Sequence, residues 1–179
     1  MMKNILKSAL LIASLALATS AQAASYSFNF LSTDSPYQVS GIFGTSNTQN
    51  SVGGYDITSI TGLVTGLGGG MISALVINPN QPLVTTNFGF NYDNVLFPAS
   101  NPVMNTNGVL FDTVSGQRWN LWGTGPSAYE LYSYPGRSSD TTIDVHGALS
   151  IAAVPEPETY AMMLAGLGLM GFIARRKAA

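Results

Sequence analysis

The chain has 179 residues, of which 46% are hydrophobic and 9% are charged, and its formal net charge is −2. This composition excludes a disordered protein, because disorder requires low hydrophobicity together with high charge. The absence of Cys excludes disulfide bonds and cysteine-ligated metal sites. The negative charge argues against a nucleic-acid-binding protein, which needs a basic surface. A chain of this length predicts one main domain.

The N-terminus has the three parts of a secretory signal peptide. Its first part carries the positive charges of Lys3 and Lys7. An apolar run from Ala9 to Ala18 follows, and the small residues Ala21 and Ala23 form a cleavage site. The apolar run is shorter than the roughly 20 residues that span a bilayer comfortably. We therefore expect a signal helix that signal peptidase removes, and an exported chain after it.

The following part alternates apolar and polar residues with period two, which is typical of strands buried on one face. The segments predicted to be strands are Ser25–Leu31, Tyr37–Gly44, Gly54–Thr65, Met71–Ile77, Phe88–Tyr92, Val109–Phe111, Trp119–Trp122, Tyr129–Tyr134 and Thr141–Ile151. In the third segment the apolar phase slips between Ile57 and Ile60, which predicts a bulge or a switch of face. The continuous apolar run Met71–Ile77 is typical of a central strand.

Turn residues separate these segments. Loop signals occur at Asn78–Pro82, Pro98–Pro102 and Gly123–Pro126, and Asn107-Gly108 is typical of a type I′ hairpin turn. No part of the body shows a convincing helical period. About eight to ten short strands with regularly spaced turns predict an all-β body, either an antiparallel β-sandwich or a jelly roll.

The body is expected to have few charged residues and a net negative charge. Two Arg and seven Asp or Glu residues between positions 24 and 154 give it a net charge of −5, which disfavours nucleic acid and anionic lipid as partners. The outward positions carry Ser, Thr, Asn and Gln, so few charged residues protect strand edges from pairing with other chains. We expect the body to self-associate or to pack into a matrix.

The segment 118–137 holds both tryptophans, several tyrosines and both arginines of the body. Aromatic faces flanked by polar groups stack well on sugars, so this segment is a candidate glycan-binding surface. The candidate contacts are Trp119, Trp122, Tyr132 and Tyr134. The alternative, which we favour, is ordinary core packing with Trp119 and Leu121 inward and Trp122 on the other face.

His146 is the only histidine of the chain, and period two places it on one strand face with Asp140, Thr142 and Asp144. This pattern is typical either of a metal or acid–base site or of the solvated face of an amphipathic strand. We favour the solvated face, because inward and outward alternation explains every residue. A zinc site usually has three or four ligands, and a second His or Cys is absent.

Other chemistry has weak support in the sequence. Asp93, Asn94 and Asp112 offer oxygen ligands for calcium, although Asp and Asn in turns usually cap the backbone. A serine nucleophile needs an oriented base, and no Gly-x-Ser-x-Gly elbow is present. We therefore predict no catalytic residue, no cofactor site and no metal site, and expect a protein that is not an enzyme.

The C-terminus begins with Pro155-Glu156-Pro157, which blocks helix and sheet pairing. The uncharged run Tyr160–Ala174 follows, and the basic cluster Arg175, Arg176 and Lys177 comes after it. As a helix the run reaches about 22 Å, less than the roughly 30 Å of a bilayer core. We predict a short transmembrane helix with the basic cluster on the cytoplasmic side and the body outside.

These three parts, in this order, resemble the PEP-CTERM sorting tail of bacterial surface proteins. The resemblance implies that exosortase, a multi-pass membrane thiol protease, recognises Pro155, Glu156 and Pro157 and removes the helix. It also implies delivery of the body to the surface or to the exopolysaccharide matrix. The body resembles a recurrent passenger of PEP-CTERM proteins that has no assigned activity. The resembling pieces are Val39–Phe43, Gly54–Gly62, Tyr92–Pro98 and Asn107–Phe111.

The sequence thus predicts a signal peptide at residues 1–23, a β-sandwich body at 24–153 and a sorting tail at 154–179. We expect an exported, non-enzymatic protein that is first a membrane-anchored precursor and then reaches the cell surface or extracellular matrix. Its expected partners are signal peptidase, an exosortase-type protease, the membrane as a transient anchor and exopolysaccharide, and no nucleic acid. The alternatives are a carbohydrate-binding module that uses segment 118–137 and, less favoured, a secreted hydrolase.

Overall fold

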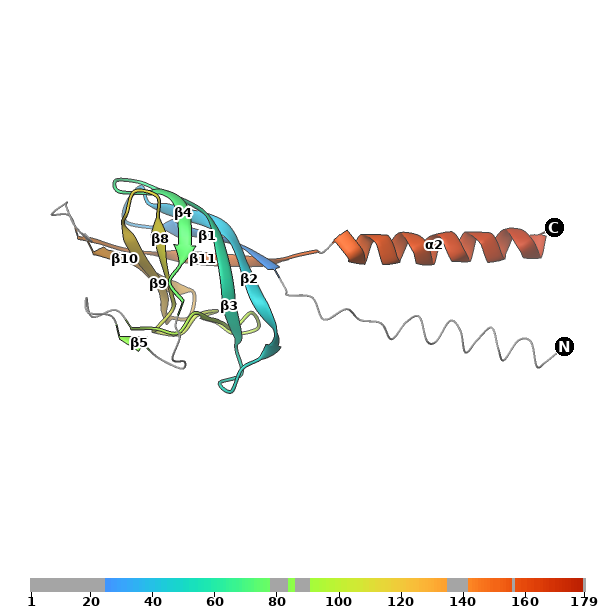
Figure 1. The fold of residues 1–179 in the computed structure, drawn as a ribbon, viewed down its shortest axis with the longest axis horizontal. Helices are drawn as coiled ribbons and strands as arrows, with labels where there is room; N and C mark the ends of the chain where they lie inside the picture. The colour runs from blue at the N-terminus through green and yellow to red at the C-terminus, as the bar shows by residue number, and fades with distance from the viewer. Residues whose placement is uncertain (1–24, 78–83, 86–90, 135–141, 156, 179) are drawn as a thin grey trace.

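The computed structural model describes residues 25–77, 84–85, 91–134, 142–155 and 157–178. Within these ranges the body is an antiparallel barrel of eight strands in the order β2-β1-β11-β10-β9-β8-β4-β3, and the pairing of β3 with β2 closes it (Figure 1). The barrel strands are β1 (Ser25–Ser32), β2 (Gln38–Gln49), β3 (Tyr55–Thr65), β4 (Gly70–Leu75), β8 (Val109–Thr113), β9 (Arg118–Gly125), β10 (Ala128–Tyr134) and β11 (Ile143–Val154). The all-β prediction is confirmed.

The predicted β-sandwich or jelly roll is wrong, because one sheet closes on itself. A sandwich and a barrel both bury one face of each strand, so period-two alternation does not separate them. The separating feature is the double pairing of β2, which bonds to β1 along one edge and to β3 along the other. This pairing is set by contacts between strands and leaves no trace in a single strand's pattern.

Large apolar side chains fill the inside of the barrel. The fully buried ones include Phe30, Phe43, Phe111 and Trp119, and Phe28 stacks on Phe43 with ring centroids 3.9 Å apart. Burial of one such side chain stabilises the fold by about 1.5–3 kcal/mol. The core of the protein is therefore the barrel interior.

The predicted bulge is confirmed on β3. Gly44 of β2 faces Ser59, whereas the next residue, Thr45, faces Ile57. Thr58 is therefore the extra residue that shifts the register, and it allows both Ile57 and Ile60 to be buried. The slip in the apolar pattern was thus a correct indication of backbone irregularity.

Two other local predictions can be compared with the structure. The central strand predicted over Met71–Ile77 contains β4, which lies between β3 and β8, but the run is not continuously buried, because Ile72 is buried whereas Met71 is 64% exposed. Asn107-Gly108 forms a turn but no hairpin. The side-chain Oδ1 of Asn105 accepts hydrogen bonds from both backbone N–H groups of this pair, and the strand that follows, β8, pairs with β9 and β4.

A second, smaller apolar cluster lies outside the barrel. Leu110 points outward between the inward Val109 and Phe111, yet it is fully buried because Tyr92 packs on it. Tyr92 belongs to β6 (Asn91–Tyr92), which pairs with β5 (Val84–Thr85), and β7 (Val95–Leu96) adds to the edge of β3. The predicted strand Phe88–Tyr92 and the loop Asn78–Pro82 fall largely or wholly outside the described residues.

The start of β1 and the end of β11 lie side by side, since Ser25 is paired with Val154. The helix α2 (Pro157–Ala178) follows β11 and extends away from the barrel (Figure 1). Within the described part of the chain, no helix combines the length and apolar character that a membrane crossing needs. The helix predicted over Tyr160–Ala174 is confirmed, and its transmembrane character is not. The predicted signal helix lies outside the described residues.

Candidate functional site

The C-terminal segment with the sorting-tail pattern begins where the barrel ends. β11 pairs with β1 up to Val154, and the next residue, Pro155, is exposed. A proline has no N–H for the ladder, so the sheet stops there. α2 then begins at Pro157, which is a favoured helix start. The segment is therefore outside the barrel core and accessible to another protein.

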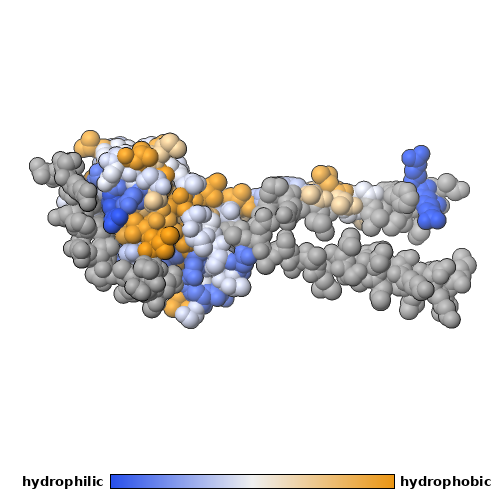
Figure 2. Space-filling model, viewed as in Figure 1, coloured by the Kyte–Doolittle hydropathy of each residue, from blue (hydrophilic) through white to orange (hydrophobic). Residues whose placement is uncertain are grey.

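The two arginines at the other end of α2, Arg175 and Arg176, are exposed. Figure 2 shows a strongly hydrophilic surface at that end of the helix. Lys177 lies within α2. Glu156 and the predicted cleavage residues Ala21 and Ala23 are outside the described residues.

The aromatic segment separates into inward and outward residues. Trp119 is fully buried in the barrel, with Nε1 donating to Oγ1 of Thr113 at 3.4 Å, so its prediction as a glycan contact is wrong. The core-packing alternative is confirmed for Trp119 and Leu121, which are both buried. Trp122 and Tyr132 are partly exposed, and their ring centroids lie 6.3 Å apart on the outer face. Tyr134 is the last residue of β10, and its side chain is not among those that the structure describes.

Three metal-ligand side chains meet on the outer face of β10 and β11. Glu130 is directly opposite His146 in the ladder, and Asp144 is two residues before His146 on the same face. One ligand atom from each of Glu130, Asp144 and His146 lies within 4.8 Å of the other two. The predicted alternation of β11 is confirmed, because Ile143 and Val145 are buried whereas Asp144 and His146 are exposed. Asp140 is outside the described residues.

Asp34 joins this cluster from the turn between β1 and β2. Its Oδ2 lies 3.3 Å from Nδ1 of His146 and accepts the backbone N–H of His146 at 3.2 Å. The hydroxyl of Ser32 donates to Oδ1 at 2.7 Å. The Ser32 hydrogen bond, with a smaller contribution from the His146 backbone, lowers the pKa of Asp34 from 3.8 to about 2, so its carboxylate is ionised at neutral pH.

Glu130 and Asp144 place two carboxyl groups together. Partial burial, followed by the hydrogen bond and charge of Asp144, raises the pKa of Glu130. The register of β10 on β11 therefore gathers two carboxyl groups at one place on the outer face, beside a histidine.

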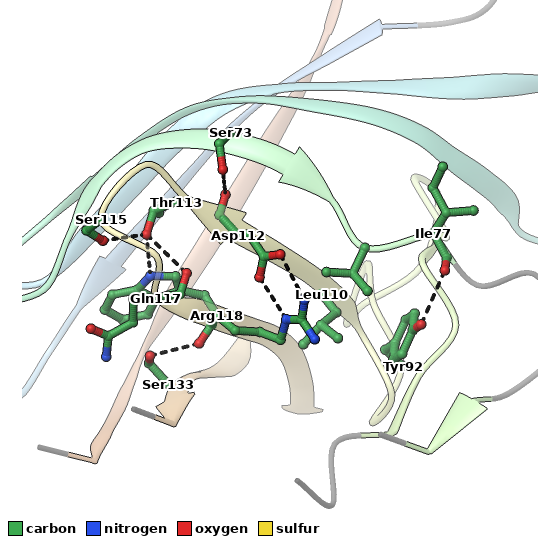
Figure 3. A network of polar contacts seen from close by, with 12 residues as sticks. Ser73, Ile77, Tyr92, Leu110, Asp112, Thr113, Ser115, Gln117, Arg118 and Ser133 are labelled. Atoms are coloured by element: carbon green, nitrogen blue, oxygen red, sulfur yellow. Dashed lines mark hydrogen bonds and ion pairs between the residues drawn. The ribbon is translucent and has the colours of Figure 1, made fainter. Parts of the chain in front are cut away.

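The oxygen ligands considered for calcium have other roles. Asp112 accepts two hydrogen bonds from the Arg118 guanidinium, from Nε at 2.7 Å and from Nη2 at 2.8 Å (Figure 3). Asp93 is buried, and its Oδ2 accepts the side-chain N–H of Asn105 at 2.6 Å. Asn94 donates to the carbonyl of Val76 and accepts the N–H of Leu110. The turn-capping interpretation holds for Asp93, whose Oδ1 also accepts the backbone N–H of Val95, whereas Asp112 pairs with an arginine on the neighbouring strand and Asn94 bonds to residues distant in the chain.

Figure 3 also shows how the polar groups around this ion pair support β8 and β9. Oγ1 of Thr113 contacts the hydroxyl of Ser115 at 2.8 Å and donates to the carbonyl of Gln117 at 3.1 Å. The hydroxyl of Ser133 donates to the carbonyl of Arg118 at 2.8 Å. These bonds hold the hairpin rigid, and none of them involves the cluster on β10 and β11.

Sequence reasoning missed Glu130 and Asp34 as neighbours of His146. Both are distant in the chain, and only the register of β10 on β11 and the path of the β1–β2 turn bring them to the histidine. The register of two paired strands is not encoded by the period of either one.

A scan against protein-family models matches residues 153–177 to the PEP-CTERM protein-sorting motif. A search of the curated proteins found no match, and neither did a search of the solved structures. The matched range includes the exposed Pro155, nearly all of α2 and its terminal arginines. Proteins with this motif are processed by exosortase, a membrane protease, and the motif implies an exported, membrane-anchored precursor. The chain carries a PEP-CTERM protein-sorting motif that begins at the last two residues of the final strand of an eight-stranded β-barrel.

Proposed function

We propose that this protein is a non-enzymatic exosortase substrate whose barrel is released from its C-terminal tail and placed at the cell surface or in the extracellular matrix. The observation that carries the proposal is the sorting motif at residues 153–177. Signal peptidase is the proposed partner at the N-terminus. After release, the barrel is proposed to lie in a matrix of exopolysaccharide.

The position of the motif supports a cut that leaves the barrel intact. The last paired residue of β11 is Val154, and Pro155 is exposed. A cut after Val154 removes no strand residue, so every pairing of the barrel survives. A cut earlier in β11 would remove pairs with β1 and expose the edge of the sheet.

The two chain ends support processing at one end of the barrel. Ser25, the first residue of β1, pairs with Val154, the last residue of β11. The start of β1, two residues after the proposed signal-peptide cut in the sequence, is therefore beside the proposed sorting cut after Val154. Both segments can hold the barrel at the same membrane surface before processing.

The outer surface supports a role in a matrix. Leu63 of β3 is opposite Met71 of β4, and both are substantially exposed. Figure 2 shows hydrophobic surface on the barrel among weakly polar residues. Because apolar surface outside a core favours association, this face provides an area where copies of the barrel or matrix components can pack.

The sorting role is tested by replacing Pro155, Glu156 and Pro157 together with alanine in the native host. The proposal predicts that the variant keeps its C-terminal tail and accumulates in the membrane fraction. The matched control is Pro126→Ala, an exposed turn proline outside the motif, which should be processed like the natural protein. Removal of the tail from the triple variant at the natural rate would contradict the proposal.

A second candidate function is carbohydrate binding by Trp122 and Tyr132. Their partly exposed rings lie together on the outer face, and aromatic rings of this kind stack on sugars. Trp122→Ala should abolish retention on the producer's own matrix while the fold remains. Tyr26→Phe, which changes a partly buried tyrosine elsewhere on the barrel, serves as the control, and unchanged retention of Trp122→Ala would remove this candidate.

A further inference from the structure

The cluster of Glu130, Asp144 and His146 has the geometry of a metal site. It combines two carboxylates and one imidazole from two hydrogen-bonded strands, and one ligand atom of each lies within 4.8 Å of the others. Zinc binds such nitrogen and oxygen ligands at about 2.0–2.2 Å. Because Asp144 is exposed and Glu130 is partly exposed, rotation of these two carboxylates can bring the ligand atoms around one ion while His146 keeps its contact with Asp34.

Asp34 gives the histidine the orientation that a metal ligand needs. Its Oδ2 lies 3.3 Å from Nδ1 of His146, and this contact favours a proton on Nδ1. The lone pair of Nε2 is then free for an ion. A metal-bound histidine almost always donates its other ring N–H to such an oxygen. Asp34 comes from a different part of the chain and is itself fixed by Ser32.

Among the described residues, no ion pair with Lys or Arg balances the carboxyl groups of Glu130 and Asp144. The Arg118 guanidinium is paired with Asp112, and His146 contacts Asp34 through Nδ1. Neither brings a Lys or Arg side chain to Glu130 or Asp144. A divalent cation would offset the charge of these two adjacent carboxyl groups.

The ligand set selects the class of ion. Calcium takes about six to eight oxygen ligands, whereas this cluster offers a nitrogen and few oxygens. An imidazole together with carboxylates suits divalent transition metals and zinc. Three protein ligands leave at least one coordination position for water.

We propose that Glu130, Asp144 and His146 bind one divalent metal ion of the zinc class on the outer face of the barrel, with Asp34 as the positioning residue for the histidine. The bound ion links β10 to β11 and, through Asp34, ties the β1–β2 turn to the same face. This proposal does not depend on the sorting function, and its test uses the purified protein.

The test is a calorimetric titration of the chelator-treated full chain with zinc alone, after purification through a tag that contains no histidine. The natural protein should bind one ion, and His146→Gln, Glu130→Gln and Asp144→Asn should each bind at least about tenfold more weakly. Asp34→Asn should weaken binding by about tenfold, the lower bound for loss of an orienting partner. Asp56→Asn, which makes the same change of charge on β3, is the control and should bind like the natural protein.

A spectroscopic readout separates coordination from general attraction. Because His146 is the only histidine of the chain, its ring signals in nuclear magnetic resonance are unambiguous, and zinc should shift them while calcium should not. Equal zinc binding by His146→Gln and the natural protein would overturn the proposal. Ring signals that zinc leaves unchanged, or an equal loss of binding in Asp56→Asn, would also overturn it.

Discussion

The carboxylate of Asp34 shows how a single side chain makes the fold sensitive to acid. Its pKa is lowered from 3.8 to about 2 in the folded protein, chiefly by the hydroxyl of Ser32. A group with a lowered folded pKa stabilises the protein above the unfolded pKa, and this contribution is lost as the pH falls through the folded pKa. The contribution of Asp34 is therefore present above about pH 4 and disappears toward about pH 2.

Ser32→Ala should raise the pKa of Asp34 toward its ordinary value, because the main hydrogen bond to the ionised form is removed. The stability of the variant should then fall less steeply than that of the natural protein between about pH 4 and pH 2. Carbon-detected titration of the Asp34 carboxyl, together with urea unfolding at several pH values, measures both effects. Ser150→Ala on β11 is the control. An unchanged pKa in Ser32→Ala would contradict this assignment.

The two tryptophans provide a matched pair at the residue scale. Trp119 is fully buried in the barrel, whereas Trp122 is partly exposed on the outer face. Trp119→Ala should cost about 3–5 kcal/mol of unfolding free energy, because it leaves a cavity in the core. Trp122→Ala should cost clearly less, and urea unfolding of the two variants compares them. Equal losses would contradict the inward and outward assignment.

At the scale of elements, the hairpin of β2 and β3 contains a close approach of two glycines. Gly41 and Gly62 are directly opposite each other. A Cβ atom on Gly41 would meet the backbone carbonyl of Thr61, and a Cβ on Gly62 would meet that of Ser40. Gly62 also has a φ of +151°, which L-residues rarely adopt. β2 and β3 can therefore approach each other this closely only because both facing residues are glycines.

Gly41→Ala should destabilise the barrel by about 1–3 kcal/mol, because the added methyl group must displace backbone atoms. Gly125→Ala is the control, since its Cβ would meet no atom within 4 Å. Thermal or urea unfolding of both variants gives the comparison. A Gly41→Ala variant as stable as the control would show that the strands separate there without cost.

The elements also show how far the sequence can predict the structure. Inward and outward residues of single strands were predictable because burial imposes period two, as in Trp119 and Leu121 or in Asp144 and His146. The bulge at Thr58 was predictable because it disturbs that period. The closure of the sheet was not predictable, because it depends on which strands pair with each other.

The candidate sites also differ in whether one segment or the pairing of several segments determines them. The sorting tail was predictable because its three parts are contiguous in the chain, and the family model matches that stretch. The cluster around His146 was not, because Glu130 reaches it through the register of β10 and Asp34 through a turn. Leu110 is another example, since an outward position became buried when Tyr92 covered it.

At the scale of the whole molecule, a closed barrel continues directly into a sorting motif, because the matched range begins at Ala153 in β11. Pairing of Ser25 with Val154 places the first and last residues of the barrel side by side, and α2 extends away from the barrel after them (Figure 1). Closing the sheet leaves the eight barrel strands with a neighbour on each side, which protects strand edges. A barrel of this kind can lose both terminal segments and keep its hydrogen bonds.

The proposed sorting requires removal of the tail, and the intact mass and cell fraction of the protein from its native host test this directly. The expected result is a species found outside the cell that begins after Ala23 and ends between Val154 and Thr159. A protein that keeps Arg175, Arg176 and Lys177 and stays in the membrane fraction would contradict the proposed sorting.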